Sequence, residues 1–376
     1  MQMGKIAKVI FVPILCCLIA GCTDMRILED QGMIQAISYD MATKDKGSDI
    51  ALIKVTAAIP LIQKDNLQKI IESTATSSKD ARIEFSSQTD LELVNGQLRT
   101  VLFGKNIAKQ GVINHFDTIL RDPTIGLRSN IIIVNGNAAK MLAENYQEQE
   151  PTYEFLDRLI EKQVDENIIP DIDIFQFMRD VKDDGIDPVA PQFIQRKNHI
   201  DTDGVALFRG ERYVTKIDAS KGTLFSILNK KMINNGQLNF DWPASQQGDA
   251  EFAALDINNS RRHINVYSSP GSNQFTVDIS IKVKGSITEY IGTKNLDNKK
   301  YRDGLGEKMA ESLEKQTQEL VIFTQKHSVD SIGIGKYVRN SISYNEWKNL
   351  DWRKVYPAIQ VHCSAEVEIR DYGLIH

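Results

Sequence analysis

The sequence is poor in the features that mark several common classes of protein. Its 376 residues include six histidines, and no two of them have the spacing of a structural zinc site, so we expect no metal. Lysine and arginine form no dense block and the formal net charge is −5, which argues against nucleic-acid binding. Gly-x-Ser-x-Gly and Walker-type motifs are also lacking. We therefore expect no cofactor, no nucleic-acid partner and no catalytic residues.

The amino end has no apolar run that is long enough to span a membrane. Lys5 and Lys8 precede an uncharged stretch, residues 9–22, which is the layout of a secretory signal peptide. Fourteen residues are fewer than the roughly 20 that a membrane-spanning helix needs. We therefore interpret residues 1–21 as a signal peptide rather than as a permanent membrane anchor.

The end of this stretch is more specific. Ile19-Ala20-Gly21-Cys22 resembles the bacterial lipobox, in which a lipoprotein signal peptidase cuts before a lipid-modified cysteine. The resemblance implies cleavage between Gly21 and Cys22 and a diacylglyceryl thioether on Cys22, which carries two fatty-acyl (palmitate-type) chains. Two acyl chains would supply the double anchor that one chain cannot. The alternative is an ordinary signal peptide that ends near a cysteine.

Cysteine is scarce, and its placement agrees with this interpretation. Of the four cysteines, Cys16 and Cys17 lie in the segment to be removed, and Cys22 would be acylated. Cys363 is then the only thiol left, so we expect no intramolecular disulfide.

Alternating and apolar runs predict several strands. Residues 33–40 and 49–60 read as an antiparallel pair, and Asn95-Gly96 predicts a second hairpin with a two-residue turn. Residues 129–136 read as a short strand buried on both faces. A further hairpin is expected to turn at residues 209–212.

Helical spacing of apolar residues predicts helices over residues 106–121, after Pro151, over residues 220–231 and from Leu305 to His327. Two alternating strands, residues 275–285 and 358–370, flank the last of these. Together the elements predict an α+β, multi-domain protein with mostly antiparallel sheets. The segment 183–204 is rich in Asp, Gly and Pro, which suggests a domain boundary near Gln195. We predict an N-terminal domain at 22–195, a middle domain at 196–260 and a C-terminal domain at 261–376.

Few motifs indicate a catalytic or ligand-binding site. Cys363 lies on the apolar face of its strand and His362 on the opposite face, so we expect a packing role for the thiol rather than catalysis. The "GIGKYV" segment lacks the third glycine of a dinucleotide site, and tight turns account better for Gly333 and Gly335. The Asp-rich segments 183–187 and 199–204 are expected to be solvated loops rather than calcium sites. Trp347 and Trp352 are expected to pack an irregular loop against the last sheet.

The order of these segments resembles the C subunit of spore germinant receptors, the Ger(x)C lipoprotein family. The resemblance rests on Cys22, Asp24, Arg26, Gly32 and Asp40 in "CTDMRILEDQGMIQAISYD". It continues through "FGKNIAKQGVINHFDTILRDP", "VALFRGERYVTKIDASKGTLFSILN" and "DSIGIGKYVRNSISYNEWKNLDW". The chain departs from the family in having Thr23 where tryptophan is common, and a strand before "VLFGK" where a helix is expected.

The resemblance implies a non-enzymatic subunit of three mixed α/β domains that is needed for spore germination. It would be lipid-anchored on the outer face of the inner spore membrane. There it would act as a scaffold and signal-transmitting component with the integral-membrane A and B subunits of a nutrient receptor.

Two questions stay open at this point. A solute-binding lipoprotein of an importer is the alternative function, although such proteins usually show repeated βα units and parallel sheets. Interaction surfaces are also open. Asp24, Arg26 and Glu29 are candidates because a tether at Cys22 would hold them near the membrane, and the polar face of the helix at 305–327 is a second candidate.

Overall fold

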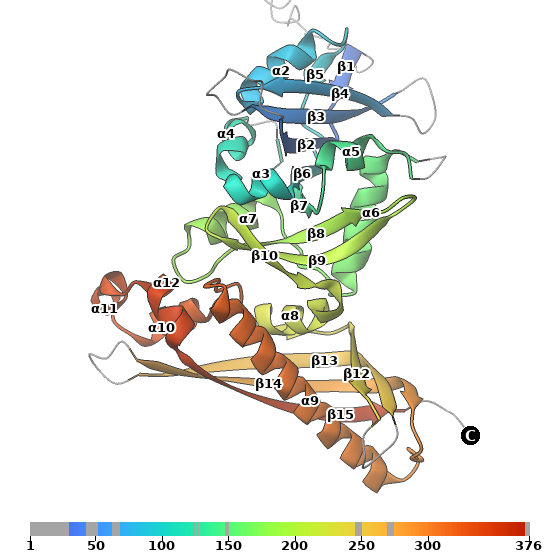
Figure 1. The fold of residues 1–376 in the computed structure, drawn as a ribbon, viewed down its shortest axis with the longest axis vertical. Helices are drawn as coiled ribbons and strands as arrows, with labels where there is room; N and C mark the ends of the chain where they lie inside the picture. The colour runs from blue at the N-terminus through green and yellow to red at the C-terminus, as the bar shows by residue number, and fades with distance from the viewer. Residues whose placement is uncertain are drawn as a thin grey trace, which may run out of the picture.

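The computed structural model describes residues 30–42, 52–61, 68–122, 125–126, 128–146, 150–244, 250–268 and 274–372. Two mixed sheets dominate it, with strand orders β10-β9-β8-β7-β6-β2-β3-β4 and β11-β13-β14-β15, where β12 also pairs with β13. Figure 1 shows them stacked along the long axis, with the N-terminal sheet at the top and the C-terminal sheet at the bottom. The α+β, multi-domain fold class is confirmed.

The N-terminal sheet has eight strands. They are β2 (Ala36–Met41), β3 (Ile53–Pro60), β4 (Gln68–Ala75), β6 (Thr100–Gly104), β7 (Asn130–Val134), β8 (Val189–Gln195), β9 (Ile200–Arg209) and β10 (Arg212–Asp218). The central strands β2, β6, β7 and β8 are parallel, and the outer pairs are antiparallel. A two-stranded parallel pair, β1 (Gln31–Met33) and β5 (Glu92–Val94), lies beside it.

Helices cover both faces of this sheet because its central strands are apolar on both sides. They are α2 (Ser78–Ser86), α3 (Lys105–Gln110), α4 (Ile113–Arg121), α5 (Ala138–Ala143), α6 (Thr152–Asp165) and α7 (Ile174–Lys182). Ile131 and Ile133 of β7 pack in one core with α2, α3, α4 and α7, whereas Ile132 packs in another with α5 and α6.

The C-terminal sheet is long and has one covered face. Its strands are β11 (Met232–Ile233), β12 (Gln237–Trp242), β13 (Glu251–Ser268), β14 (Phe275–Ile291) and β15 (Gln360–Asp371). Its helices are α8 (Gly222–Asn229), α9 (Lys299–Lys326), α10 (Ile334–Ser341), α11 (Tyr344–Asn349) and α12 (Trp352–Val355), with 3-10 turns η2 (Ala219–Lys221) and η3 (Tyr356–Ala358). Burial alternates along β14, so one face packs against helices and the other meets solvent.

Several sequence predictions are confirmed. The antiparallel pair β2–β3, the buried strand β7 and the hairpin β9–β10 all form where expected. Helices α6 and α8 also form, and α9 covers the predicted helix but begins earlier, at Lys299. In residues 68–94 the chain has both a strand, β4, and a helix, α2, before β5.

The hairpin predicted at Asn95-Gly96 is wrong. The Leu98 N–H does donate to the Asn95 carbonyl, so the chain turns there. However, β5 pairs in parallel with β1, and β6 pairs in parallel with β2 and β7. Burial of β6 on both faces outweighs the local hairpin signal.

Two other predictions differ from the structure. The helix expected over 106–121 is divided into α3 and α4, because Gly111 adopts a φ of 124° that no helix contains. The segment 199–204 is not a loop, since Asp201 and Asp203 belong to strand β9.

The predicted middle domain, residues 196–260, contributes to both sheets. Its strands β9 and β10 pair with β8 in the N-terminal sheet, while β11, β12 and most of β13 belong to the C-terminal sheet. Gln195 ends β8, next to the turn that joins β8 to β9. Among the described residues, no helix is both long and apolar enough to cross a membrane.

Candidate functional site: the junction between the two sheets

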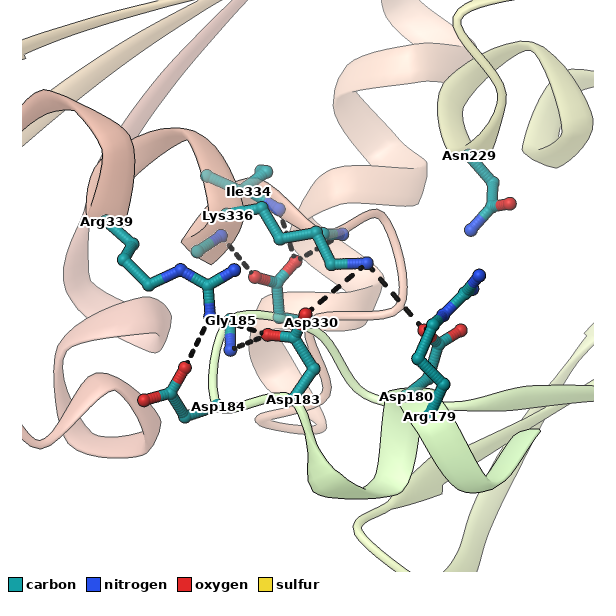
Figure 2. A network of polar contacts seen from close by, with 12 residues as sticks. Arg179, Asp180, Asp183, Asp184, Gly185, Asn229, Asp330, Ile334, Lys336 and Arg339 are labelled. Atoms are coloured by element: carbon teal, nitrogen blue, oxygen red, sulfur yellow. Dashed lines mark hydrogen bonds and ion pairs between the residues drawn. The ribbon is translucent and has the colours of Figure 1, made fainter. Parts of the chain in front are cut away.

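The two sheets meet at a junction built from two loops far apart in the sequence. One loop, residues 183–188, follows α7 and leads into β8; the other, residues 327–333, joins α9 to α10. Figure 2 shows polar contacts in this region, which link α7 and its loop to α10 and link Asp330 to the start of α10. An apolar core continues beneath, because Val205 and Leu207 of the N-terminal sheet pack in one cluster with α8, α9 and the C-terminal sheet.

Asp330 is the centre of the junction. Its side chain is 2% exposed, and its Oδ1 accepts the N–H groups of Gly333 and Ile334, each at 2.9 Å. Its Oδ2 accepts the Gly335 N–H at 2.6 Å and the Trp352 indole Nε1–H at 3.0 Å. The carboxylate therefore caps α10 and also fixes α12, as an acceptor at a helix amino end does.

Asp187 ties this cap to the N-terminal sheet. Its Oδ2 accepts the Asp330 N–H at 2.9 Å, its Oδ1 accepts the Gly210 N–H at 3.1 Å, and its own N–H donates to the Asp330 carbonyl at 2.9 Å. Burial raises the pKa of Asp187, against the N–H donors that lower it. Burial also raises the pKa of Asp330 to about 6, again opposed by its donors.

A second layer of the junction is ionic. Arg339 of α10 contacts Asp183 at 2.8 Å and Asp184 at 2.6 Å. Lys336 lies 3.7 Å from Asp180, at the end of α7. Burial raises the pKa of Asp183, but the Gly185 N–H and Arg339 outweigh it, so the pKa lies below its ordinary value. The carboxylates of α7 and its loop are thus matched by cations of α10 (Figure 2).

Glycines let the two backbones approach. A Cβ on Gly185 would lie 2.9 Å from the Lys336 nitrogen, and one on Gly335 would lie 2.5 Å from the Trp352 Nε1 atom. Real Cβ atoms essentially never come so close to backbone or ring atoms. The junction is consequently packed without a gap at these positions.

Further contacts lock the same two parts of the chain. The Trp347 Nε1–H donates to Asp184 at 2.8 Å. Arg209 of the N-terminal sheet donates to the carbonyls of His327 and Ser328, which follow α9, and Asn229 donates to the Ser331 carbonyl at 2.9 Å. The Arg209 and Trp347 contacts join the two sheets, whereas the Asn229 contact holds α8 against the loop before α10 within the C-terminal part.

The arrangement suits a structural joint between the two sheets. Each oxygen of the two buried carboxylates already accepts a hydrogen bond from the protein. Within the part of the chain that the structure describes, no cluster of His, Cys, Asp and Glu could hold a metal ion. Sheets linked by a short buried network and a shared apolar core move together, because such packing is not continuously deformable.

The sequence-predicted sites fall partly outside this region. Gly21, Cys22, Asp24, Arg26 and Glu29 all lie outside the described residues. Cys363 is partly buried on β15, and burial raises the pKa of its thiol to about 12, which keeps it protonated and a poor nucleophile. His362 is exposed on the other face of that strand.

The junction itself was missed by sequence reasoning. The segment 183–187 was expected to be solvated, but Asp187 is buried and Asp183 and Asp184 are ion-paired. The tight turn at Gly333 is confirmed, since its φ is 79°, but Gly335 lies within α10 rather than in a turn. Trp347 and Trp352 lie in α11 and α12, short helices where an irregular loop was expected, and both are buried.

One residue of the resembling motifs also has a structural role. Both oxygens of Asp40 accept backbone N–H groups at the start of α5, from Ala138 at 3.0 Å and from Ala139 at 2.7 Å. Asp40 therefore holds α5 against β2, and burial raises its pKa.

Taken together, the fold and junction define an elongated, multi-domain α+β protein organised around a rigid interdomain joint. Comparison with known proteins is more specific. Residues 24–195 match the model of the spore germination protein N-terminal domain, and residues 203–373 match that of the spore germination B3/GerAC-like C-terminal domain.

Whole-chain relatives agree. Spore germination protein GerQC of Bacillus cereus is 25% identical over 364 residues, covering 96% of this chain and 97% of the relative. The putative spore germination protein YfkR of Bacillus subtilis (strain 168) is 22% identical over 395 residues, covering 99% and 98%. The crystal structure of the GerBC protein shares the fold, with a TM-score of 0.57 and 15% identity over 90% of this chain and 99% of that one.

The chain therefore belongs to the GerAC-like family of germinant receptor C subunits. This family has a role in spore germination, its members work within receptor complexes, and it is not a known enzyme family.

Proposed function

We propose that this protein is a lipid-anchored, non-enzymatic subunit of a spore germinant receptor, held on the outer face of the inner spore membrane with the integral-membrane A and B subunits. It acts as a scaffold that passes a conformational signal. The observation that carries the proposal is the junction: a buried carboxylate network joins two sheets into one column within a family of receptor subunits.

The position of the proposed anchor indicates which of the two sheets would lie nearer the membrane. Cys22 lies eight residues before Asp30, the first described residue. A fully extended connection of that length spans about 28 Å, at roughly 3.5 Å per residue. Acylation of Cys22 would therefore keep the N-terminal sheet close to the bilayer, and the C-terminal sheet would lie at the far end of the long axis (Figure 1).

The junction suggests how a signal passes along this axis. The loop after α7 contacts α10 directly through Asp183 and Arg339, and Asp187 holds the loop before α10. A displacement of α7 by a membrane partner would move α10, and with it the packed face of the C-terminal sheet. No flexible linker separates the two, because β10 leads through η2 directly into α8.

Replacing Cys22 by serine tests the anchor. Serine cannot form the thioether, so the variant is expected to leave the inner-membrane fraction of spores, and nutrient-triggered germination through its receptor is expected to fail. Immunoblots of membrane and soluble fractions measure the first effect, and the loss of optical density after nutrient addition measures the second.

Thr23→Ser is the matched control, since it alters the next residue without touching the thiol. Wild-type distribution of Cys22→Ser would contradict the lipid anchor. Separately, a tagged wild-type chain purified from spore membranes should bring two multi-spanning proteins with it, and their absence would contradict the receptor assembly.

A further inference from the structure

The outer face of the C-terminal sheet has more cations than carboxylates around Lys282 and Lys284, although the chain as a whole is acidic. This face lies opposite the helices, and its side chains form rows across the strands. In one row Arg261 of β13 faces Lys282 of β14, which faces Glu366 of β15. In the next row Lys284 faces Glu368. Arg261, Lys282, Lys284 and Arg370, together with Lys231, which lies just before β11 and lines the larger hollow, are called the basic sheet face.

Two hollows run along this face. One has a volume of about 1040 Å³ and the other about 580 Å³, and they share Arg261 and Lys282, so they form one continuous trough. Short side chains create the depth, because Ser280 and Ser364 face each other beside the row of longer residues. Seven lysines and arginines line the trough, whereas Glu366 is its only lining carboxylate among the described residues.

Two of these seven cations form hydrogen bonds that stabilise the fold. Arg262 points to the covered face, where it donates to the Leu228 carbonyl and, at 2.8 Å, to the Tyr337 hydroxyl. Lys230 donates to the Asn167 side chain at 2.9 Å. The five residues of the basic sheet face therefore account for the charge available to a partner.

That charge is only partly neutralised. Glu366 pairs with Lys282 at 2.5 Å, and Glu368 pairs with Lys284 at 2.6 Å and with Arg370 at 2.8 Å. No carboxylate of the described residues forms an ion pair with Arg261, which is exposed and directly opposite Lys282. Like charges directly opposite each other on paired strands destabilise a sheet, so this pair costs stability unless an anion lies between them.

The geometry favours an extended chain over a small ligand. The trough is open, its walls are long exposed side chains, and it is larger than the roughly 300–1,000 Å³ of small-molecule pockets. Lys282 and Lys284 lie two residues apart on one face of β14, a spacing of about 7 Å. Alternate carboxylates of an extended peptide have the same spacing.

We propose that the basic sheet face binds an extended, acidic segment of a partner polypeptide, with Arg261 and Lys282 bridged by its carboxylates. A membrane surface is the less suitable partner on the proposed anchor at Cys22, because this sheet lies at the opposite end of the molecule from the N-terminal strands (Figure 1). The inference goes beyond the proposed receptor role, and it is tested without any germination assay.

Arg261→Glu is the informative variant. A glutamate at this position would face Lys282 and replace a like-charge pair with an opposite-charge pair, so the sheet is expected to fold. Lys197→Glu, in the exposed turn between β8 and β9, makes the same change of charge far from the trough. The probe is a fluorescein-labelled octaglutamate peptide, with octaglutamine as the neutral comparison, and anisotropy is measured on the full-length chain in mild detergent.

Octaglutamate is expected to bind the wild type and octaglutamine is not. Arg261→Glu should weaken binding on the order of tenfold, because a charge-assisted contact is lost, while Lys197→Glu should bind as the wild type does. Equal binding by Arg261→Glu and the wild type would overturn the proposal. So would competition by citrate at the same carboxylate concentration as octaglutamate, which would indicate a small-anion site. Retention on phosphatidylglycerol vesicles that depends on Arg261 would identify a lipid surface instead.

Discussion

Replacing Asp330 by asparagine is expected to lower the free energy of unfolding by about 3 kcal/mol at pH 8, where the carboxylate is ionised. The wild-type carboxylate accepts four hydrogen bonds, three from backbone N–H groups and one from Trp352. Asparagine has a single acceptor oxygen, and its NH₂ group would face N–H donors that no water can reach. Removing one partner of a buried network costs more than the network contributes when intact.

Urea unfolding followed by tryptophan fluorescence measures this loss, because Trp352 donates to the carboxylate itself. Asp351→Asn is the matched control, since Asp351 is exposed and its one ion pair with a described residue is the surface pair with Lys354. It should leave the urea midpoint unchanged. If Asp330→Asn unfolds at the same midpoint as Asp351→Asn, the carboxylate does not hold the junction.

Local patterns in the sequence predicted the elements far better than their partners. The apolar run of β7, the alternation along β14 and the helix start at Pro151 follow from side-chain period and backbone chemistry. The pairing of β5 with β1 does not, because Asn95-Gly96 is compatible with a hairpin and with the turn observed. Which strand lies next to which is decided by burial of the whole sheet.

The junction could not be located from the sequence for a related reason. Asp187 and Asp330 are 143 residues apart, and Asp184 and Trp347 are 163 apart. Taken alone, the segment 180–187 has the composition of an Asp-rich loop, and the segment 330–335 has that of a glycine turn. Two signals were available: Gly333 and Gly335 so close together, and carboxylates spaced along 180–187. These features also fit solvated loops, because neither segment alone indicates that it contacts the other.

Two helical glycines offer a test of close packing in which the same substitution should have opposite effects. Gly335→Ala is expected to destabilise the protein by about 2 kcal/mol, because overpacking typically costs 1–3 kcal/mol. The new Cβ would lie 2.5 Å from the Trp352 Nε1 atom and 2.9 Å from the Gly185 carbonyl oxygen. The indole is held by its hydrogen bond to Asp330. Neither the indole nor the backbone at Gly185 can move away from the added Cβ without disrupting contacts of the junction.

Gly304→Ala, in the exposed interior of α9, is expected to stabilise the protein by about 0.5–1 kcal/mol, because alanine loses less backbone entropy in a helix and nothing lies within 4 Å of the added Cβ. Urea midpoints of the two variants should therefore move in opposite directions from the wild type. A shift of Gly335→Ala toward higher stability would mean that the backbones of α10 and the loop after α7 are not in contact. The two sheets would then be joined mainly by the contact of Asp187 with Asp330, the ion pairs of Arg339 and the shared apolar core.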